Sequence, residues 1–339
     1  MTIEDRLDES WPLEYTESIS CCPYCSQKIS NIEYSGLIDC TFGNAPGKWN
    51  YYKCQTCKSL YLNPRPNNEK IYLAYSKYYT HGLTNINSIV KLKNKIKNEI
   101  FFQVYGIKNN HRLFCDKTPL IFFIWMDKWI NKFFGFVEIV SSPKGRLLDL
   151  GCGDGSSLEI AKKLGWDVIG IEIDGLAVEC SKQKGLHAIE GDYRLLREYE
   201  NYFNCIICSH VLEHLDRPID ALVGMFNSLK KGGMLILSLP NSESILQDFF
   251  KEHWRGLECP RHLSIPSLGC LKKILEKIGF NVTQKNSSKI YTLDESWEIM
   301  KKYKKITMMD RFKFMRLKFC RTGINSNKSD FIEFICIKK

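Results

Sequence analysis

Two pairs of cysteines near the start of the chain have the spacing of a metal site. Cys22 and Cys25 form one Cys-x-x-Cys pair, and Cys54 and Cys57 form a second one. Four thiolates from two such turns can surround a zinc ion tetrahedrally, and the metal then stabilises a segment too small for its own core. The spacing therefore predicts a structural zinc site.

A glycine-rich segment further along could hold a nucleoside. In LLDLGCGDGS, residues 147–156, an apolar run ends at Asp149, and Gly151 and Gly153 follow in a turn. Glycines allow the backbone of such a turn to approach a ligand closely. Asp149 disfavours a pyrophosphate beside the turn and favours a ligand that carries an ammonium group.

Two further acids follow the next apolar runs. Glu172 ends VIGIEID, where a carboxylate can accept hydrogen bonds from both hydroxyls of a ribose. Asp192 in EGDY is placed to accept one from an adenine amino group, and Ser209 joins this set at the end of the next run. Three acids in successive loops predict a nucleoside cofactor without phosphate; the alternative is a set of solvated loop acids.

The segment SHVLEHL, residues 209–215, supplies groups for proton transfer. His214 can take a proton from an acceptor hydroxyl or an activated carbon, and Glu213 can orient it or bind hydroxyl groups. The alternative is that His214 packs at a helix start. The candidate catalytic residues are His214, Glu213, His210 and His262.

A parallel sheet would bring these loops to one edge. Beyond Pro143, short apolar runs alternate with helical patterns, which predicts βαβ units with right-handed crossovers. The expected strands are 146–150, 167–173, 187–189, 204–209 and 233–239. The last run, 331–337, predicts a final strand in an antiparallel hairpin with one near 289–293.

Two helices have recognisable ends. Asp216 is expected to cap a helix that takes Pro218 in its first turn and ends at Gly232. Ser267 is expected to start another helix, which Gly279 stops.

The composition is that of an ordinary globular chain. Its 339 residues, 44% hydrophobic, are enough for about two domains with cores. The acidic start lacks the pattern of a signal peptide, and no run of about 18 apolar residues occurs. We therefore expect a cytoplasmic protein with reduced thiols, in which clustered cysteines bind metal and Cys21 and Cys40 are substitutes or bystanders. The net charge of +10 favours an anionic partner.

The segments LLDLGCGDGS, VIGIEID, EGDY, NCIICSHVLEHL and LKKGGMLILSLPN together resemble the ordered motifs of class I S-adenosylmethionine-dependent methyltransferases. The resemblance covers about residues 144–280. It implies an enzyme with a Rossmann-like α/β fold, whose seven-stranded sheet has its last strand antiparallel. It also assigns Gly151, Gly153, Glu172 and Asp192 to binding of S-adenosylmethionine.

The N-terminal part resembles another group of enzymes. CCPYC, YYKCQTCKSLYLNPRP and YYTHG are similar to the zinc-binding region of sugar C-methyltransferases and of related methyltransferases of surface-glycan biosynthesis. In those relatives a zinc-bearing segment and tyrosines cover the acceptor pocket. The resemblance implies that Tyr75, Tyr78 and Tyr79 form a lid; packing on a helix is the alternative.

The segment HWRGLECPRHLSIPS, residues 253–267, resembles the same glycan-associated enzymes. It implies that His253, Arg255, Arg261 and His262 lie near the acceptor. An arginine there could bind a sugar nucleotide or a carboxylate, and the alternative is a structural loop with surface cations.

Three regions follow from these patterns. The expected domains are a zinc-binding module at 1–80, a basic and aromatic helical linker or lid at 81–143, and a methyltransferase domain at 144–339. The basic stretches 89–101 and 301–319 and the apolar stretch 119–137 could contact an anionic membrane at its inner face or bind nucleic acid. The alternative is that their apolar faces are buried in the protein.

The leading hypothesis is methyl transfer to a hydroxyl or carbon of a sugar or glycan, as a nucleotide-linked sugar or during surface polysaccharide biosynthesis. Zinc would be structural, and catalysis would need no other metal. A quinone-precursor O-methyltransferase is the first rival, because VLEHL resembles those enzymes as well. Methylation of RNA is disfavoured because no tetrapeptide of the Asn-Pro-Pro-Tyr type follows the fourth strand. The intact acids and glycines argue against a degenerate binding scaffold.

Overall fold

The computed structural model describes residues 11–28, 31–75, 136–285, 292–319 and 326–339. Tyr78, Tyr79 and the segment 89–101 lie outside the described residues, as do most of the 81–143 linker and of the 119–137 stretch. None of the described helices is long and apolar enough to cross a membrane.

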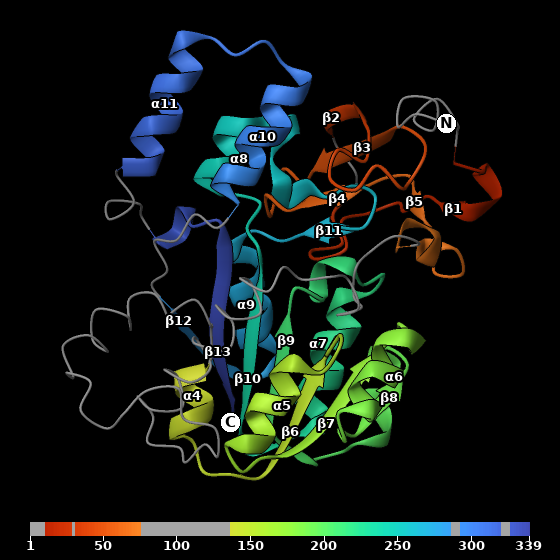
Figure 1. Ribbon diagram of the computed structural model, residues 1–339, viewed down its shortest axis with the longest axis vertical. Coiled ribbons are helices and arrows are strands. Elements are labelled where there is room, and N and C mark those ends of the chain that lie inside the picture. Colours follow the sequence, from red (N-terminus) through yellow and green to blue (C-terminus); the bar gives the residue numbers. More distant parts are fainter. Residues whose placement is uncertain (1–10, 29–30, 76–135, 286–291, 320–325) are drawn as a thin grey trace. The chain divides into compact units, whose positions relative to one another are not determined.

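A seven-stranded sheet is the frame of the C-terminal half (Figure 1). Its strands are β6 (Arg146–Leu150), β7 (Asp167–Glu172), β8 (Ala188–Glu190), β9 (Phe203–Ser209), β10 (Leu229–Pro240), β12 (Phe280–Gln284) and β13 (Phe331–Lys338). They are hydrogen-bonded in the order β12-β13-β10-β9-β6-β7-β8. β7 pairs in parallel with β6 and β8, whereas β13 runs antiparallel to both β10 and β12. The predicted Rossmann-like sheet with an antiparallel last strand is confirmed.

The predicted strands of the parallel part of the sheet follow from buried apolar runs. In β6, Leu147 and Leu148 are fully buried, as expected for a strand covered on both faces. The hairpin partner of the last strand was predicted wrongly. β12 is that partner, and Leu293 instead begins a helix that carries acidic residues in its first turn, where they suit the helix dipole.

The α-helices are α4 (Phe136–Ser141), α5 (Ser156–Lys163), α6 (Gly175–Gln183), α7 (Pro218–Ser228), α8 (Ile245–Phe250), α9 (Leu268–Ile278), α10 (Leu293–Tyr303) and α11 (Met308–Phe319). The start of α9 is as predicted, because the Ser267 hydroxyl accepts a hydrogen bond from the Cys270 N–H at 3.2 Å. Gly279, with φ 121°, follows its last residue.

The ends of α7 differ from the prediction. Arg217 is its N-cap residue, and the Asp216 carboxylate does not cap it, because that group accepts hydrogen bonds from Asn68 and Arg194. The helix ends at Ser228, and Gly232 lies within β10 with φ 74°. Gly232 was predicted to end the helix, but it is a residue of β10 whose positive φ favours glycine.

The N-terminal segment forms smaller sheets. Its strands are β1 (Thr16–Glu17), β2 (Asn31–Leu37), β3 (Trp49–Lys53), β4 (Leu60–Leu62) and β5 (Arg65–Pro66). β1 pairs with β5, and a four-stranded sheet has the order β11-β4-β3-β2. Because β11 (Ser264–Ile265) comes from the C-terminal half, that sheet joins the two ends of the chain.

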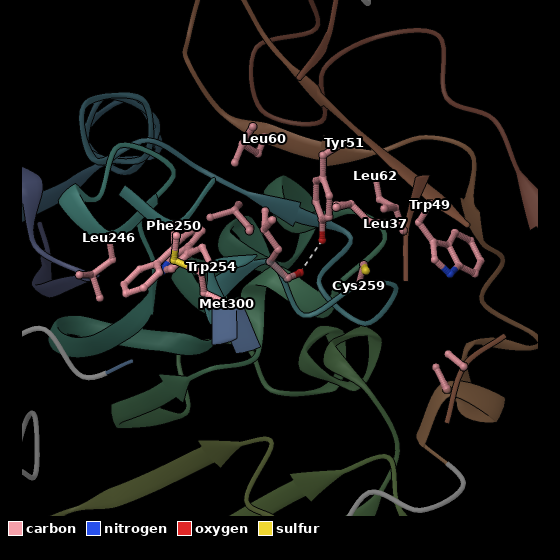
Figure 2. Close-up of a cluster of buried hydrophobic side chains, with 14 of the residues drawn as sticks. Leu37, Trp49, Tyr51, Leu60, Leu62, Leu246, Phe250, Trp254, Cys259 and Met300 are labelled. Carbon is pink, nitrogen blue, oxygen red and sulfur yellow. Dashed lines mark hydrogen bonds between the residues drawn. The ribbon is translucent and has the colours of Figure 1, made fainter. Parts of the chain in front are cut away.

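Buried side chains from both ends of the chain form one core there. Figure 2 shows Trp49 and Tyr51 of β3 in the same cluster as Phe250, Trp254 and Met300. The Tyr51 hydroxyl lies 2.6 Å from the Leu257 carbonyl oxygen and can donate a hydrogen bond to it. The N-terminal segment is thus packed as part of a larger core.

Short 3₁₀ helices connect several of these elements. They are η1 (Leu13–Tyr15), η2 (Ile71–Tyr75), η3 (Tyr193–Glu198), η4 (Leu212–His214), η5 (Lys251–His253), η6 (Arg255–Leu257) and η8 (Ser326–Lys328). The chain divides into two compact units. One contains β1–β5, η3, η4 and the elements from α7 onward, and the other contains α4, β6–β8, α5, α6 and residues 203–205. The domain boundaries predicted at residues 80 and 143 stay predictions.

Candidate functional site

The four predicted zinc ligands lie together. The Cys22 and Cys57 sulfur atoms are 3.6 Å apart, and those of Cys25 and Cys54 are 3.4 Å apart. With Zn–S bonds of about 2.3 Å, a tetrahedral site places its sulfur atoms about 3.8 Å apart. The donor set and its spacing are therefore compatible with a zinc module.

The two cysteine turns have the same local structure. In each, the residue after the second cysteine has a positive φ, 59° at Ser26 and 64° at Lys58. In each, that residue's N–H donates to the carbonyl oxygen of the first cysteine, Cys22 or Cys54. Two matched turns can present four sulfur atoms to one centre.

The second cysteine turn is bonded to the C-terminal half of the chain. The Ser267 hydroxyl donates to the Cys57 carbonyl oxygen at 2.6 Å, and the Ser242 hydroxyl donates to that of Lys58 at 2.9 Å. Cys21 and Cys40 are not part of the four-sulfur group. The cysteine cluster is thus placed to hold the start of α9 as well as its own turns.

The residues predicted to bind the cofactor's amino acid and ribose lie at the ends of two neighbouring strands, with Gly151 and Gly153 in the turn after β6 and Glu172 at the end of β7. Glu172 accepts hydrogen bonds from the Gly153 N–H at 2.8 Å and the Asp174 N–H at 3.0 Å, one on each carboxylate oxygen. Each oxygen keeps a second lone pair for a ribose hydroxyl. Gly151 and Gly153 have φ 77° and 53°, and nothing lies within 4 Å of the point where a Gly153 side chain would begin. This open turn fits a bound nucleoside.

Asp149 is buried and faces the charge of a second acid. Burial raises the pKa of Asp149 to about 7, and the negative charge of Glu172 adds to the shift. A ligand ammonium group would favour the ionised form of this carboxyl group. Asp192 is half-buried, and Ser209 is exposed at the end of β9. Their roles toward a cofactor stay predictions.

Cofactor affinity should therefore depend on pH. Because the raised pKa means that Asp149 must lose a proton to bind an ammonium group, S-adenosylhomocysteine affinity should rise about tenfold from pH 6 to pH 8. Calorimetry at several pH values measures this. Asp149→Asn should remove the dependence, whereas Glu172→Ala should weaken binding at every pH. An equal slope in Asp149→Asn would contradict the assignment.

The predicted catalytic residues of the acceptor side surround a buried carboxylate. Glu213 is fully buried, and neither of its oxygens has a hydrogen-bond partner among the described residues. His210 Nδ1 lies 3.5 Å and His262 Nε2 4.0 Å from Glu213 Oε1. Burial raises the pKa of Glu213, but the three histidines His210, His214 and His262 outweigh it, so that the pKa lies below its usual value. A charged carboxylate lies at the centre of this cluster, and the His210 Nδ1 atom, 3.5 Å from Oε1, lies nearer to it than His262 Nε2 does.

His214 is held by its Nδ1 atom. This atom lies 3.1 Å from the Arg261 carbonyl oxygen and 2.8 Å from the Tyr75 hydroxyl. Since a carbonyl oxygen only accepts, we infer that Nδ1 carries the hydrogen and Nε2 keeps its lone pair. Nε2 is then free to act as a base. Tyr75 was predicted as a lid residue, and it is the one of the three tyrosines that the structure describes.

His262 is oriented in a similar way. Its Nδ1 atom lies 2.7 Å from the Gly256 carbonyl oxygen, and its Nε2 atom lies 3.7 Å from Glu258. Its ring centre is 4.7 Å from that of His214. Burial lowers the pKa of His262 to about 4, although the Glu258 carboxylate acts in the opposite direction. The ring is therefore neutral at pH 7, and Nε2 is a second acceptor facing Glu213.

His262 should affect stability at low pH. Its pKa is lower in the folded chain than in the unfolded one, so its stabilising contribution is complete above about pH 6.5 and is lost as pH falls toward 4. Chemical unfolding of the wild type and of His262→Gln should show a difference in unfolding free energy that changes by roughly 2 to 3 kcal/mol between pH 7 and pH 4. Parallel profiles would contradict the burial of a neutral ring.

Two arginines expected at the acceptor have structural partners instead. Arg261 is fully buried, and its guanidinium donates to Asp39 at 3.0 Å and to Glu258 at 3.2 Å. Arg255 is paired with the same Glu258. The expectation that Arg261 binds an acceptor is wrong, because its donors are used inside the protein. His253 is half-buried beside Glu252, 3.7 Å from its carboxylate.

Glu258 and Asp39 were missed by the sequence reasoning. Glu258 directly precedes the CPRH segment, four residues before His262, so the chain spacing was a usable signal. Its pKa is lowered to about 2, since His262 and Arg255 outweigh the effect of burial. Asp39 lies far from Arg261 in the sequence, and no pattern in the chain links the two.

The comparisons with known proteins concern the same part of the chain. Residues 125–285 match a family model described as a methyltransferase domain. The expected methyltransferase domain is thereby confirmed for this part of the chain. The match includes the acids, the glycines and the histidine-rich loop, whereas the cysteine module lies outside it.

Curated relatives extend over less of the chain. A protein of Xanthomonas campestris named ubiquinone biosynthesis O-methyltransferase is 36% identical over 112 residues, 30% of this chain and 46% of the relative. One of the same name from Xanthomonas axonopodis is 35% identical over 117 residues, 31% of this chain and 48% of the relative. The chain thus spans about half the length of these relatives.

Among solved structures, similarity is found to a methyltransferase dependent on S-adenosylmethionine from Archaeoglobus fulgidus. The two chains are 22% identical with a TM-score of 0.43, over 63% of this chain and 92% of the other.

Proposed function

We propose that this chain transfers a methyl group from S-adenosylmethionine to a hydroxyl oxygen of a sugar that carries neighbouring hydroxyl groups. The observation that carries the proposal is the buried, charged Glu213: neither oxygen accepts a hydrogen bond among the described residues, and the His210 Nδ1 atom stays 3.5 Å from Oε1. His262 Nε2 adds another acceptor beside it. Unpartnered buried acceptors are costly, and two adjacent hydroxyl groups would supply the donors they lack.

The chain's own groups suit the methyl donor. S-adenosylmethionine, when bound, supplies an electrophilic methyl group. Asp149 would face its ammonium group, and Glu172 would accept from the ribose hydroxyls while it holds the Gly153 N–H. Asp192 would accept from the adenine amino group. These roles need no phosphate-binding residues.

On the acceptor side, His214 would remove the proton. With Nδ1–H directed at the Arg261 carbonyl oxygen, Nε2 is the atom that takes the proton from the attacking hydroxyl group. Glu213 would hold a neighbouring hydroxyl and stabilise the imidazolium that forms. The Tyr75 hydroxyl keeps the His214 ring in one orientation. Alignment of the two reactants would supply most of the rate enhancement.

An arginine-rich cavity supports an acceptor linked to phosphate groups. This cavity of about 510 Å³ is lined by Glu17, Arg65, Asn68, Tyr193, Arg194, Arg197, Asp216, Arg217 and Asp220. Four guanidinium groups are more than the three acids can neutralise, and Arg217 follows His214 by three residues. A nucleotide-linked sugar is therefore the form of the acceptor that we propose.

A phenol of the quinone-precursor type is the second candidate. The names of the Xanthomonas relatives favour it, since these proteins are called ubiquinone biosynthesis O-methyltransferases. A phenol with adjacent hydroxyl groups would satisfy Glu213 in the same way as a sugar. Both candidates are methylated on oxygen. The sequence hypothesis also included transfer to a carbon atom of a sugar, and the names of these O-methyltransferase relatives do not favour it.

We further propose that the four cysteines bind one structural zinc ion. The sulfur spacing and the matched turns support this assignment. The ion would take no part in proton transfer. It would hold the turn that is bonded to Ser267 at the start of α9.

Glu213→Gln tests the role of the buried carboxylate. It keeps the shape of the side chain but loses the charge, so kcat/KM should fall at least about tenfold with an acceptor that has two adjacent hydroxyl groups. With an acceptor in which one of these hydroxyl groups is replaced by hydrogen, the same substitution should lower kcat/KM by a smaller factor. The exposed Glu276→Gln on α9 is the matched control. An equal loss with both acceptors would contradict binding of two hydroxyl groups.

A further inference from the structure

Helix α11 exposes a row of large apolar side chains. The exposed fractions are 88% for Met308, 61% for Phe312, 49% for Met315 and 82% for Phe319. Because a helix turns about 100° per residue, these four positions form one narrow stripe along its length, here called the outer stripe. Single exposed apolar residues are ordinary, but a continuous row marks an interaction surface.

The opposite side of the same helix is packed on the protein. Phe314 stacks on Trp297 of α10, with ring centres 4.3 Å apart, and Leu317 contacts the buried cluster of Figure 2. Lys318 is 3.1 Å from Asp294 of α10. The helix is therefore anchored by its inner face, and its outer stripe is a second apolar face.

Positive charges flank the outer stripe on both sides. At 100° per residue, Arg311 lies on one flank and Arg316 lies on the other. Within the part of the chain that the structure describes, Arg311 and Arg316 form no ion pair. The acid of this helix, Asp310, accepts from Thr307 at 2.8 Å. The surface is thus an apolar ridge between cations.

We propose that α11 binds the surface of an anionic lipid membrane. Phenylalanine and methionine side chains of the outer stripe would enter the boundary between headgroups and acyl chains, and the flanking arginines would meet the anionic headgroups. An anionic membrane therefore accounts for both the apolar outer stripe and the arginines beside it.

A second copy of this chain fits the surface less well. A symmetric dimer through the outer stripe would bring the arginines of both copies together, and like charges across an interface are unfavourable. The net charge of +10 also favours an anionic surface over another copy.

Sedimentation of the full chain with lipid vesicles tests the proposal. The wild type should bind vesicles that contain about one third phosphatidylglycerol in phosphatidylcholine, and binding should weaken as salt is raised. Phe312→Ser with Phe319→Ser should weaken binding at least about tenfold. Arg311→Gln with Arg316→Gln should weaken it roughly 30-fold, since each basic residue contributes about fivefold.

Leu13→Ser is the matched control, because Leu13 is 82% exposed but lies outside α11. Circular dichroism verifies that each variant is folded. A wild type that does not bind the vesicles would overturn the proposal, as would a Leu13→Ser variant that loses as much binding. A dimer that Phe312→Ser dissociates would assign the surface to a second copy. Vesicle binding needs neither cofactor nor methyl transfer, so this result is independent of the proposed reaction.

Discussion

His214→Ala is expected to lower the rate of the chemical step by a factor of about 10² to 10⁴ while leaving cofactor affinity nearly unchanged. The reason is that proton removal by Nε2 assists only the transition state. Single-turnover kinetics with saturating cofactor measure the rate, and calorimetry measures the affinity.

His210→Ala is the matched control for that experiment. The His210 Nδ1 atom is 3.5 Å from Glu213 Oε1, and the His210 side chain is 47% exposed. Burial lowers the pKa of His210, but the Glu213 carboxylate outweighs this, so that the pKa is raised overall and the ring is a weaker candidate for the base. A rate that survives in His214→Ala and is lost in His210→Ala would move the role of base to His210. A loss of acceptor affinity at unchanged turnover would make His214 a binding residue.

Cys57→Ser is expected to release the zinc ion and unfold the N-terminal segment. Structural zinc sites contribute roughly 10 kcal/mol or more to the folding of isolated zinc modules. In this larger core we expect the free energy of unfolding to fall by about 5 kcal/mol. The Cys57 carbonyl oxygen is bonded to Ser267, so the disturbance should reach α9. Elemental analysis and thermal unfolding measure both effects.

Cys21→Ser is the control, because Cys21 is a neighbour of the four-sulfur group but not a member of it. It should retain about one zinc per chain and unfold at the wild-type temperature. A folded, active preparation without metal would contradict the structural role. If Cys57→Ser still held a metal ion, that ion would be bound elsewhere. Glu213 and His262 could then bind a cation instead of acceptor hydroxyl groups.

The sheet and the cofactor turn could be predicted because their causes are local. An apolar run such as Arg146–Leu150 predicts a buried strand, and the acid and glycines that follow it predict a turn open to a ligand. The hairpin of β13 was harder, because its partner β12 alternates exposed and buried residues and lacks a long apolar run. The pairing of β12 with β13, and not an apolar run, makes this segment a strand.

The acceptor side depends on contacts between distant residues. Arg261 was predicted from its type to bind a ligand, but Asp39 pairs with it across more than 200 residues. The contact between Tyr75 and His214 likewise joins parts of the chain that no local pattern connects. Sequence reasoning named candidate residue types for this side, and the fold determines which of them remain available for chemistry.

The most direct test of the account is methyl transfer from S-adenosylmethionine that is radiolabelled in its methyl group. Purified protein would be given nucleotide sugars, phenols with adjacent hydroxyl groups, and RNA in separate reactions. The account predicts label on a hydroxyl oxygen of a sugar, and lower incorporation with Glu213→Gln and His214→Ala. Label on a phenol alone would favour the second candidate. Label in RNA alone would contradict the central claim.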